Sequence, residues 1–145
     1  MNEINDEFIT NMLLNSKIVA IVGASNKPER ASNGIMKFLL KNGYNCIPIN
    51  PNEDEVLGVK AYKCLLDLDV RPDIVDVFRR SEETPNIVKE AALKKAKLIW
   101  LQEGIYSEEA KEIADKASIP IIMDKCLFKE YLRLIISKKG NTNTN

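Results

Sequence analysis

The 145-residue chain contains no histidine at all. Catalytic triads and general bases that depend on an imidazole are therefore excluded, and so is chemistry through a phosphohistidine. The three cysteines, Cys46, Cys64 and Cys126, include no Cys-x-x-Cys pair, so we expect no zinc or other metal site. An odd number of thiols is most simply explained by reduced cysteines that pack inside the protein.

The chain also lacks an excess of charge of either sign. Lys and Arg together number 21, as do Asp and Glu, so the net charge is zero. A neutral chain has no broad basic face for phosphate backbones, and we expect no nucleic-acid partner. No stretch approaches the roughly 20 apolar residues that cross a bilayer. Because the start, MNEINDEF, is acidic and polar rather than signal-like, we expect a cytoplasmic protein that does not bind membranes.

Short apolar runs alternate with stretches of helical periodicity, which indicates an α/β protein. Runs typical of buried strands lie at residues 17–23, 44–51, 73–78, 97–104 and 119–124, with a further short strand expected within 57–68. Helical patterns cover residues 3–15, 32–42, 81–96, 110–117 and 127–137, and Ser32 is the expected N-cap of the second. Such alternation predicts a single-domain, Rossmann-like, doubly wound fold, with a mainly parallel five- to six-stranded sheet and helices on both faces.

The length suits one domain with a substantial core and is too short for two. We expect a helix in residues 1–15 that packs on the domain, the Rossmann-like domain itself over residues 16–136, and a polar, disordered tail over residues 137–145.

The segment IVGASNKPERASNG joins the first predicted strand to the next helix, at the edge of the sheet where such folds bind ligands. Gly23 permits a tight turn, Ser25 supplies a hydroxyl, and Gly34 allows a ligand to approach the helix closely. The amides at the helix start attract phosphate, and Lys27 and Arg30 add positive charge. The loop therefore predicts an anion site.

Two arginines, Arg79 and Arg80, follow the strand predicted over residues 73–78. They either grip phosphates through their planar donor groups or form surface ion pairs with the acidic residues that follow. If these arginines converge with Lys27 and Arg30 at the ligand-binding edge of the sheet, four cations gather at one site of a neutral protein. Such a cluster favours a polyphosphorylated small molecule as the ligand.

An NAD site is disfavoured by two features of the chain. The first loop lacks the Gly-x-Gly-x-x-Gly spacing of dinucleotide sites. The second predicted strand ends in Asn50-Pro51, where an acidic residue would bind the ribose hydroxyls of NAD.

Five ordered motifs carry a resemblance to a known family: VGASNKPERASNGIMKFLLKNGY, IPINPNEDEVLG, DIVDVFRR, WLQEGI and IIMDKC. In order and spacing they resemble the stand-alone CoA-binding proteins, single-domain relatives of the N-terminal domain of the succinyl-CoA synthetase α subunit. The resemblance covers about residues 16–131. It implies that residues 16–136 form a CoA-binding domain, with coenzyme A as cofactor and CoA or acyl-CoA as the partner.

The resemblance also implies roles for ten residues. Gly23, Ala24 and Ser25 would line the CoA, and Lys27 and Arg30 would contact its phosphates. Asn50 and Pro51 would form a wall near the adenosine. Phe78, Arg79 and Arg80 would flank the diphosphate and the adenine. Since the phosphohistidine of the synthetase is absent, the resemblance supports binding and does not support ligase activity.

Two other functions stay open on the sequence. One is an enzyme that acts on a CoA thiol or an acyl-CoA through Cys126, Glu103 or Asp124; the other is a regulatory domain that binds NAD or ATP. Gln102 and Glu103 follow a predicted strand and could touch the pantetheine arm of CoA. Asp76 lies inside a buried strand and needs a partner that the sequence does not name. A protein partner or a homo-oligomer is also possible.

Overall fold

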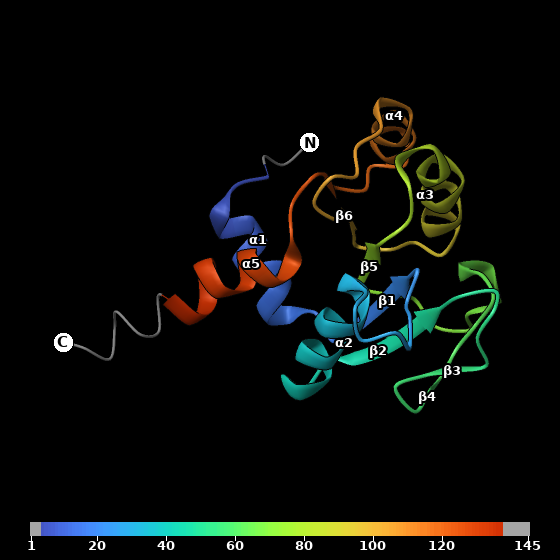
Figure 1. The fold of residues 1–145 in the computed structure, drawn as a ribbon. Coiled ribbons are helices and arrows are strands. Elements are labelled where there is room, and N and C mark those ends of the chain that lie inside the picture. The colour runs from blue at the N-terminus through green and yellow to red at the C-terminus, as the bar shows by residue number, and fades with distance from the viewer. Residues whose placement is uncertain (1–3, 138–145) are drawn as a thin grey trace.

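A computed structural model describes residues 4–137 (Figure 1). Five of its strands form one parallel sheet. The strands are β1 (Ile18–Val22), β2 (Asn45–Ile49), β5 (Ile74–Val77), β6 (Leu98–Leu101) and β7 (Ile121–Ile122). Their order in the sheet is β2-β1-β5-β6-β7, and every neighbouring pair is parallel. The short strands β3 (Glu55–Val56) and β4 (Val59–Lys60) pair with each other as a separate antiparallel hairpin. The predicted α/β fold with a mainly parallel sheet is confirmed.

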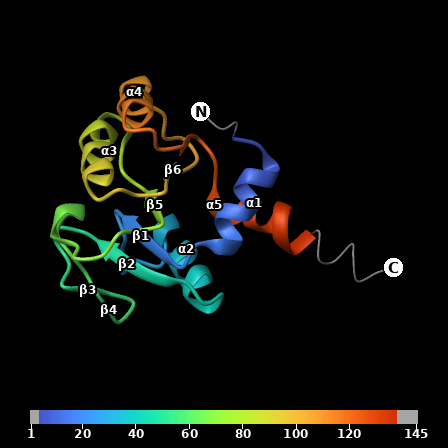
Figure 2. The same ribbon diagram turned by 180° about the vertical axis from the view of Figure 1, so that it is seen from behind.

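Helices cover both faces of this sheet (Figures 1 and 2). They are α1 (Asp6–Asn15), α2 (Ala31–Lys41), α3 (Thr84–Leu93), α4 (Glu108–Lys116) and α5 (Leu127–Tyr131), which continues as a π-helix over Leu132–Ile136. Two further 3₁₀ turns lie at Leu65–Asp67 and Ser81–Glu83. Helices α1, α2 and α5 pack on one face of the sheet, and α3 and α4 on the other.

Side chains of each central strand alternate between the two layers of core. In β1, Val19 and Ile21 face the layer of α1, α2 and α5, whereas Ala20 and Val22 face that of α3 and α4. A strand buried on both sides has no polar face, which is why its sequence is a continuous apolar run rather than an alternating one.

Helix α1 is tied to the domain at both of its ends. Asn5 caps its N-terminus by accepting a hydrogen bond from an amide of the first turn, and the Leu13 side chain near its C-terminus is buried. The Tyr44 hydroxyl donates to the Leu13 carbonyl, and the Arg133 guanidinium contacts both carboxylate oxygens of Asp6 at 2.9 Å. The predicted boundaries of the Rossmann-like domain, after residue 15 and after residue 136, stay a prediction. Of the predicted tail, residues 138–145 lie outside the described part of the chain.

The predicted N-cap of α2 is wrong by two residues. Arg30 occupies the N-cap position, and Ser32 lies buried inside the first turn. The Arg30 amide donates to the Lys27 carbonyl, so a turn precedes the helix and starts it earlier than the pattern of apolar residues suggests. No side chain caps this N-terminus, and the first turn carries no acidic residue. The Asn33 amide donates to the Arg30 carbonyl, so the Ala31 and Ser32 amides are the ones left for another acceptor.

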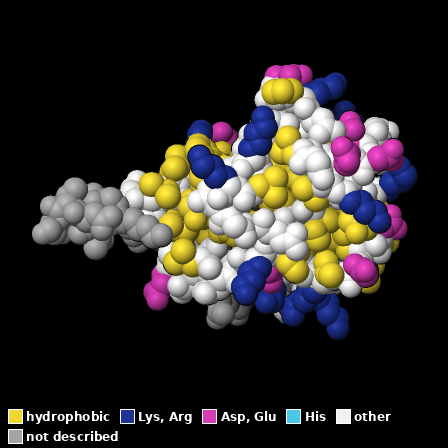
Figure 3. Space-filling model, turned by 90° about the horizontal axis from the view of Figure 1, so that it is seen from below, with side chains coloured by type: hydrophobic (Ala, Val, Ile, Leu, Met, Phe, Trp, Pro, Cys, Tyr) yellow, Lys and Arg dark blue, Asp and Glu magenta, His cyan; other side chains and the backbone are white. Residues whose placement is uncertain are grey.

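The surface matches the balanced composition. Seen from below, side chains of both charge signs are interspersed with hydrophobic ones (Figure 3). Within residues 4–137, no helix combines the length and the apolar character that crossing a membrane requires.

Candidate functional site at the carboxyl ends of the strands

The strand order reverses between β1 and β5. From β1 the chain moves to β2 on one side, and it then crosses back to place β5 on the other side. Doubly wound sheets bind ligands in the crevice at such a reversal, outside the carboxyl ends of the strands. Here that crevice lies between Gly23, which follows β1, and Phe78, which follows β5.

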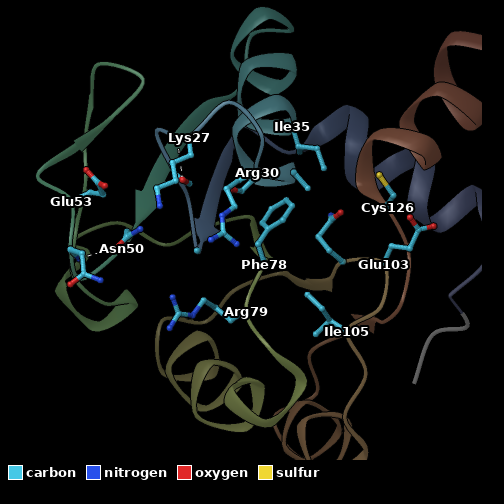
Figure 4. A pocket seen from close by; sticks show the side chains of 16 residues that line it. Lys27, Arg30, Ile35, Asn50, Glu53, Phe78, Arg79, Glu103, Ile105 and Cys126 are labelled. Atoms are coloured by element: carbon cyan, nitrogen blue, oxygen red, sulfur yellow. Dashed lines mark hydrogen bonds between the residues drawn. The ribbon is translucent and has the colours of Figure 1, made fainter.

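A cleft of about 650 Å³ occupies this position (Figure 4). Its volume falls in the range of roughly 300–1,000 Å³ that is common for small-molecule sites. The cleft is lined by Gly23, Ser25, Lys27, Arg30, Ala31, Ser32, Ile35, Asn50, Asn52, Glu53, Phe78, Arg79, Gln102, Glu103, Ile105 and Cys126.

Three asparagines hold the loop after β1 in shape. Asn33 donates to the Ser25 carbonyl at 2.9 Å, and Asn50 donates to the Ala24 carbonyl at 2.8 Å. Asn26 bonds the backbone of the β3–β4 hairpin on both of its amide atoms. Sequence reasoning assigned no role to Asn26 or Asn33, although asparagine near a glycine turn is a common way to satisfy loop carbonyls.

Gly23 is required where β1 and β5 end. Its φ is +91°, and a Cβ placed on it would lie 2.8 Å from the Phe78 carbonyl oxygen. Side chains avoid both that backbone conformation and that contact. The close approach of the two strand ends forms the floor of the cleft.

Positive charge gathers at one end of the cleft. Lys27 and Arg30 come from the first loop and Arg79 from the end of β5, and one carboxylate, that of Glu53, lies on the same side (Figure 4). The uncapped N-terminus of α2, with Ala31 and Ser32 on the cleft, adds free amides and the positive end of a helix dipole. Donors of this kind from three directions suit phosphate groups.

An acidic side chain holds Arg79 in place. Arg79 Nη2 lies 2.8 Å from Glu83 Oε1, and the hydrogen bond from Arg79 is the largest cause of a lowered Glu83 pKa. Arg80 behaves differently: its side chain is 77% exposed and pairs with Glu82 and Glu83 at 3.5 Å. Of the two alternatives for these arginines, surface ion pairing describes Arg80, whereas Arg79 both pairs and lines the cleft.

The cleft brings together seven of the ten predicted residues: Gly23, Ser25, Lys27, Arg30, Asn50, Phe78 and Arg79. Pro51 lines an adjoining cavity of about 370 Å³, which shares Gly23 and Arg79 with the cleft. Ala24 is fully buried, and neither cavity includes Arg80 among its lining residues.

The opposite end of the cleft is more apolar, with Ile35, Ile105 and Cys126 around it (Figure 4). Glu103 also lies there, and its two carboxylate oxygens are each 3.1 Å from Lys129 Nζ. Of the three residues considered for catalysis, Cys126 and Glu103 line the cleft. The third, Asp124, accepts a hydrogen bond from the Gly104 amide at 2.6 Å.

Asp76 has its partner at the floor of the cleft. Gln102, directly after β6, donates from Nε2 to Asp76 Oδ1 at 2.8 Å. Burial raises the pKa of the Asp76 carboxyl well above its usual range, while the hydrogen bond from Gln102 acts in the other direction. Nowhere in residues 4–137 do three His, Cys, Asp or Glu side chains gather where they could hold a metal ion.

The chain matches a family model described as "CoA binding domain" over residues 17–131. It is 41% identical over 119 residues to the uncharacterized protein YneT of Bacillus subtilis, covering 82% of this chain and 88% of that protein. It is 33% identical over 119 residues to an ADP-forming acetate–CoA ligase of Methanocaldococcus jannaschii, covering 77% of this chain but only 17% of the ligase. A hypothetical protein from Pyrococcus horikoshii has the same fold, with a TM-score of 0.88, 40% identity, and coverage of 93% of this chain and 99% of that one.

Proposed function

The chain belongs to the CoA binding domain family, which makes coenzyme A its cofactor, and from this premise we propose that it is a stand-alone CoA- or acyl-CoA-binding protein that catalyses no reaction of its own. The observation that carries the proposal is the uneven distribution of side chains in the cleft. Three cations lie with Glu53 at one end, and Ile35, Ile105 and Cys126 lie with Glu103 at the other. CoA is uneven in a matching way, with phosphates at one end and a thiol at the other. The lack of histidine supports binding without chemistry that needs an imidazole.

In this proposal the phosphates of CoA lie at the cationic end. Lys27 and Arg30 contact them from the loop after β1, and Arg79 contacts them from the end of β5, where Glu83 already orients its guanidinium. The free amides at the start of α2 supply further donors. Charge-assisted hydrogen bonds of this kind are about twice as strong as those between neutral groups, so they should dominate affinity.

The two cavities divide the rest of the cofactor. The adjoining cavity at Pro51 shares Gly23 and Arg79 with the phosphate end of the cleft, which supports a position for the adenosine in that cavity. The pantetheine arm then extends past Phe78 toward Ile35 and the thiol end of the cleft. Ser25 and Asn50 line the path between them, and the buried Ala24 shapes the loop from behind.

Calorimetric titration with CoA, dephospho-CoA, acetyl-CoA, NAD and ATP tests the proposal. If the cations bind the 3′-phosphate, CoA should bind more tightly than dephospho-CoA. Arg30→Ala and Arg79→Ala should each weaken CoA binding by about tenfold or more and remove much of that difference. Failure of wild-type protein to bind CoA would refute the cofactor, and equal binding of CoA and dephospho-CoA would refute the 3′-phosphate contact.

Arg80→Ala is the matched control, because it removes the same charge one residue away from Arg79. The Arg80 side chain lies in solvent with Glu82 and Glu83, so we expect a change in CoA affinity of less than about threefold, typical of a screened surface charge. A loss as large as that of Arg79→Ala would mean that long-range charge, rather than contact, sets the affinity.

The regulatory alternative, binding of NAD or ATP, is tested in the same titration. At the end of β2, where NAD sites carry an acidic residue, the Asn50 side chain is occupied on both sides. It donates to the Ala24 carbonyl and accepts from the Asn52 amide. We therefore expect weaker binding of NAD than of CoA, and tighter binding of NAD would favour the alternative.

A thiol reaction is the second candidate function, because Cys126 lines the end of the cleft assigned to the CoA thiol. In thiol–disulfide exchange, the Cys126 thiolate would attack CoA disulfide, form a protein–CoA mixed disulfide and release one CoA thiolate. Mass spectrometry after incubation with CoA disulfide detects the adduct. An unchanged mass, or an adduct that persists in Cys126→Ser, would remove this role.

The proposal extends to the cellular location of the protein and to its binding partners. We propose a cytoplasmic protein without a nucleic-acid partner, consistent with the neutral net charge. The effect of CoA binding would then be passed on through a protein partner or through a homo-oligomer of this chain. Light scattering with and without CoA distinguishes a monomer from a homo-oligomer.

A further inference from the structure

Asp76 lies at the centre of the sheet, on strand β5. In the register of the sheet it stands between Ile21 of β1 and Trp100 of β6, both fully buried. The Asp76 side chain is itself 0% exposed. An acid at such a place costs stability unless it is bonded, so an apolar residue would serve the fold better. Its presence needs another explanation.

The bonding of Asp76 is incomplete within the described part of the chain. Its Oδ1 accepts from Gln102 Nε2 at 2.8 Å, and its Oδ2 has no hydrogen-bond partner there. Burial raises the pKa of Asp76 and so favours the uncharged acid. Within the described residues, the Gln102 carboxamide is therefore the single hydrogen-bond partner of the Asp76 side chain.

Gln102 connects this buried acid to the cleft. Its backbone amide donates to the Val77 carbonyl, which continues the pairing of β6 with β5, and its side chain is 5% exposed and lines the cleft. A carboxamide is planar, so fixing its nitrogen on Asp76 also fixes the direction of its oxygen. That oxygen is left as an acceptor beside the apolar half of the cleft.

We propose that Asp76 is a positioning residue that orients the Gln102 carboxamide, whose oxygen accepts a hydrogen bond from the pantetheine arm of CoA. This inference rests on the proposed function, because the donor is a group of the bound cofactor. The pantetheine arm carries two amide N–H groups, a hydroxyl and a thiol, all donors. An acceptor held on a rigid strand end binds such a donor without the entropy cost of ordering a free glutamine.

The test compares two ligands on three proteins by calorimetry. The ligands are CoA and adenosine 3′-phosphate 5′-diphosphate, which keeps the adenine and phosphates and lacks the pantetheine arm. The proteins are wild type, Asp76→Leu and Asp76→Asn. Leucine removes the bond to Gln102 in a similar volume, whereas asparagine keeps an acceptor oxygen of the same shape.

Asp76→Leu should weaken CoA binding by about three- to tenfold, the effect of one neutral hydrogen bond, and leave binding of the truncated ligand unchanged. Asp76→Asn should restore CoA affinity to within about twofold of wild type. Equal loss for both ligands would show general damage to the fold, and no loss for CoA would show that the bond is irrelevant; either result overturns the positioning role. Lack of CoA binding by wild type would instead refute the proposed function.

A double-mutant cycle keeps the inference falsifiable if Asp76→Leu changes stability. In a Gln102→Leu background there is no carboxamide left to orient, so adding Asp76→Leu should cause no further loss of CoA affinity. Additive losses would show that Asp76 acts on the ligand by another route and would overturn the inference.

Discussion

Replacing Gly23 with alanine tests the geometry on which the site depends. Gly23 has a φ of +91°, and an added Cβ would lie 2.8 Å from the Phe78 carbonyl oxygen, 3.1 Å from Arg79 Cδ and 3.2 Å from the Phe78 carbonyl carbon. Two of these three atoms are backbone of the strand end after β5, which cannot move as a flexible side-chain tip does. The substitution therefore combines two costs.

The two costs can be assigned magnitudes. A non-glycine residue in the left-handed region costs roughly 1–2 kcal/mol, and forcing a methyl group into packed backbone costs roughly 1–3 kcal/mol. For a domain of this size, a sum of about 2–5 kcal/mol lowers the melting temperature by about 5 to 15 °C. Because Gly23 borders both cavities, any shift that relieves the contact also displaces the first loop or Arg79, and CoA affinity should fall with stability.

Gly43→Ala is the matched control. Gly43 has a φ of +88°, and nothing lies within 4 Å of its added Cβ, so only the backbone cost of roughly 1–2 kcal/mol applies. Thermal unfolding followed by circular dichroism gives the stability of each variant, and calorimetry gives its affinity for CoA. If Gly23→Ala melts no lower than Gly43→Ala and binds CoA like wild type, the argument from the close approach of the two strand ends is wrong.

Three further predictions concern stability. Burial raises the folded-state pKa of Asp76, so its contribution to stability is fully present below the unfolded pKa of about 4 and is lost as the pH rises through the folded pKa. As the pH rises from about 4, the free energy of unfolding of Asp76→Asn should therefore gain on that of wild type by up to about 1.4 kcal/mol per pH unit, which urea unfolding at several pH values measures. For Asp73, burial alone would raise the pKa, but hydrogen bonds led by those from the Ile18 and Lys17 amides make the net shift downward. The contribution of Asp73 to stability is present above the unfolded pKa and is lost as the pH falls through the folded pKa. Wild type should therefore be more stable than Asp73→Asn at neutral pH, and acid unfolding should show that this difference in stability disappears below about pH 4. Tyr44→Phe removes the hydrogen bond to a carbonyl of α1 and should cost about 0.5–1.5 kcal/mol in urea unfolding; an unchanged midpoint would show that the bond contributes nothing.

Local patterns were enough to predict the fold. The buried strands were identifiable because a strand covered on both faces is largely apolar, as β1 and β6 are along their whole length. Gly23 was identifiable as part of a turn at the ligand-binding edge, because the carboxyl ends of all strands in a parallel sheet lie at the same edge. The resemblance to the CoA-binding proteins, carried by motifs at those strand ends, is confirmed by the family match.

Other features depend on which residues the strand register brings together. Arg79 and Arg80 are adjacent in the sequence, yet only Arg79 lines the cleft, because the chain leaves β5 and turns at that point. Asp76 and Gln102 are 26 residues apart and meet only because β5 and β6 are neighbours in the sheet. The sequence by itself determined the layers of the protein and the edge of the sheet at which the cleft forms, because burial on both faces makes the central strands largely apolar. Only the tertiary structure decided which side chains share the cleft and which buried acid stands behind it, because those contacts depend on strand order and register rather than on neighbours along the chain.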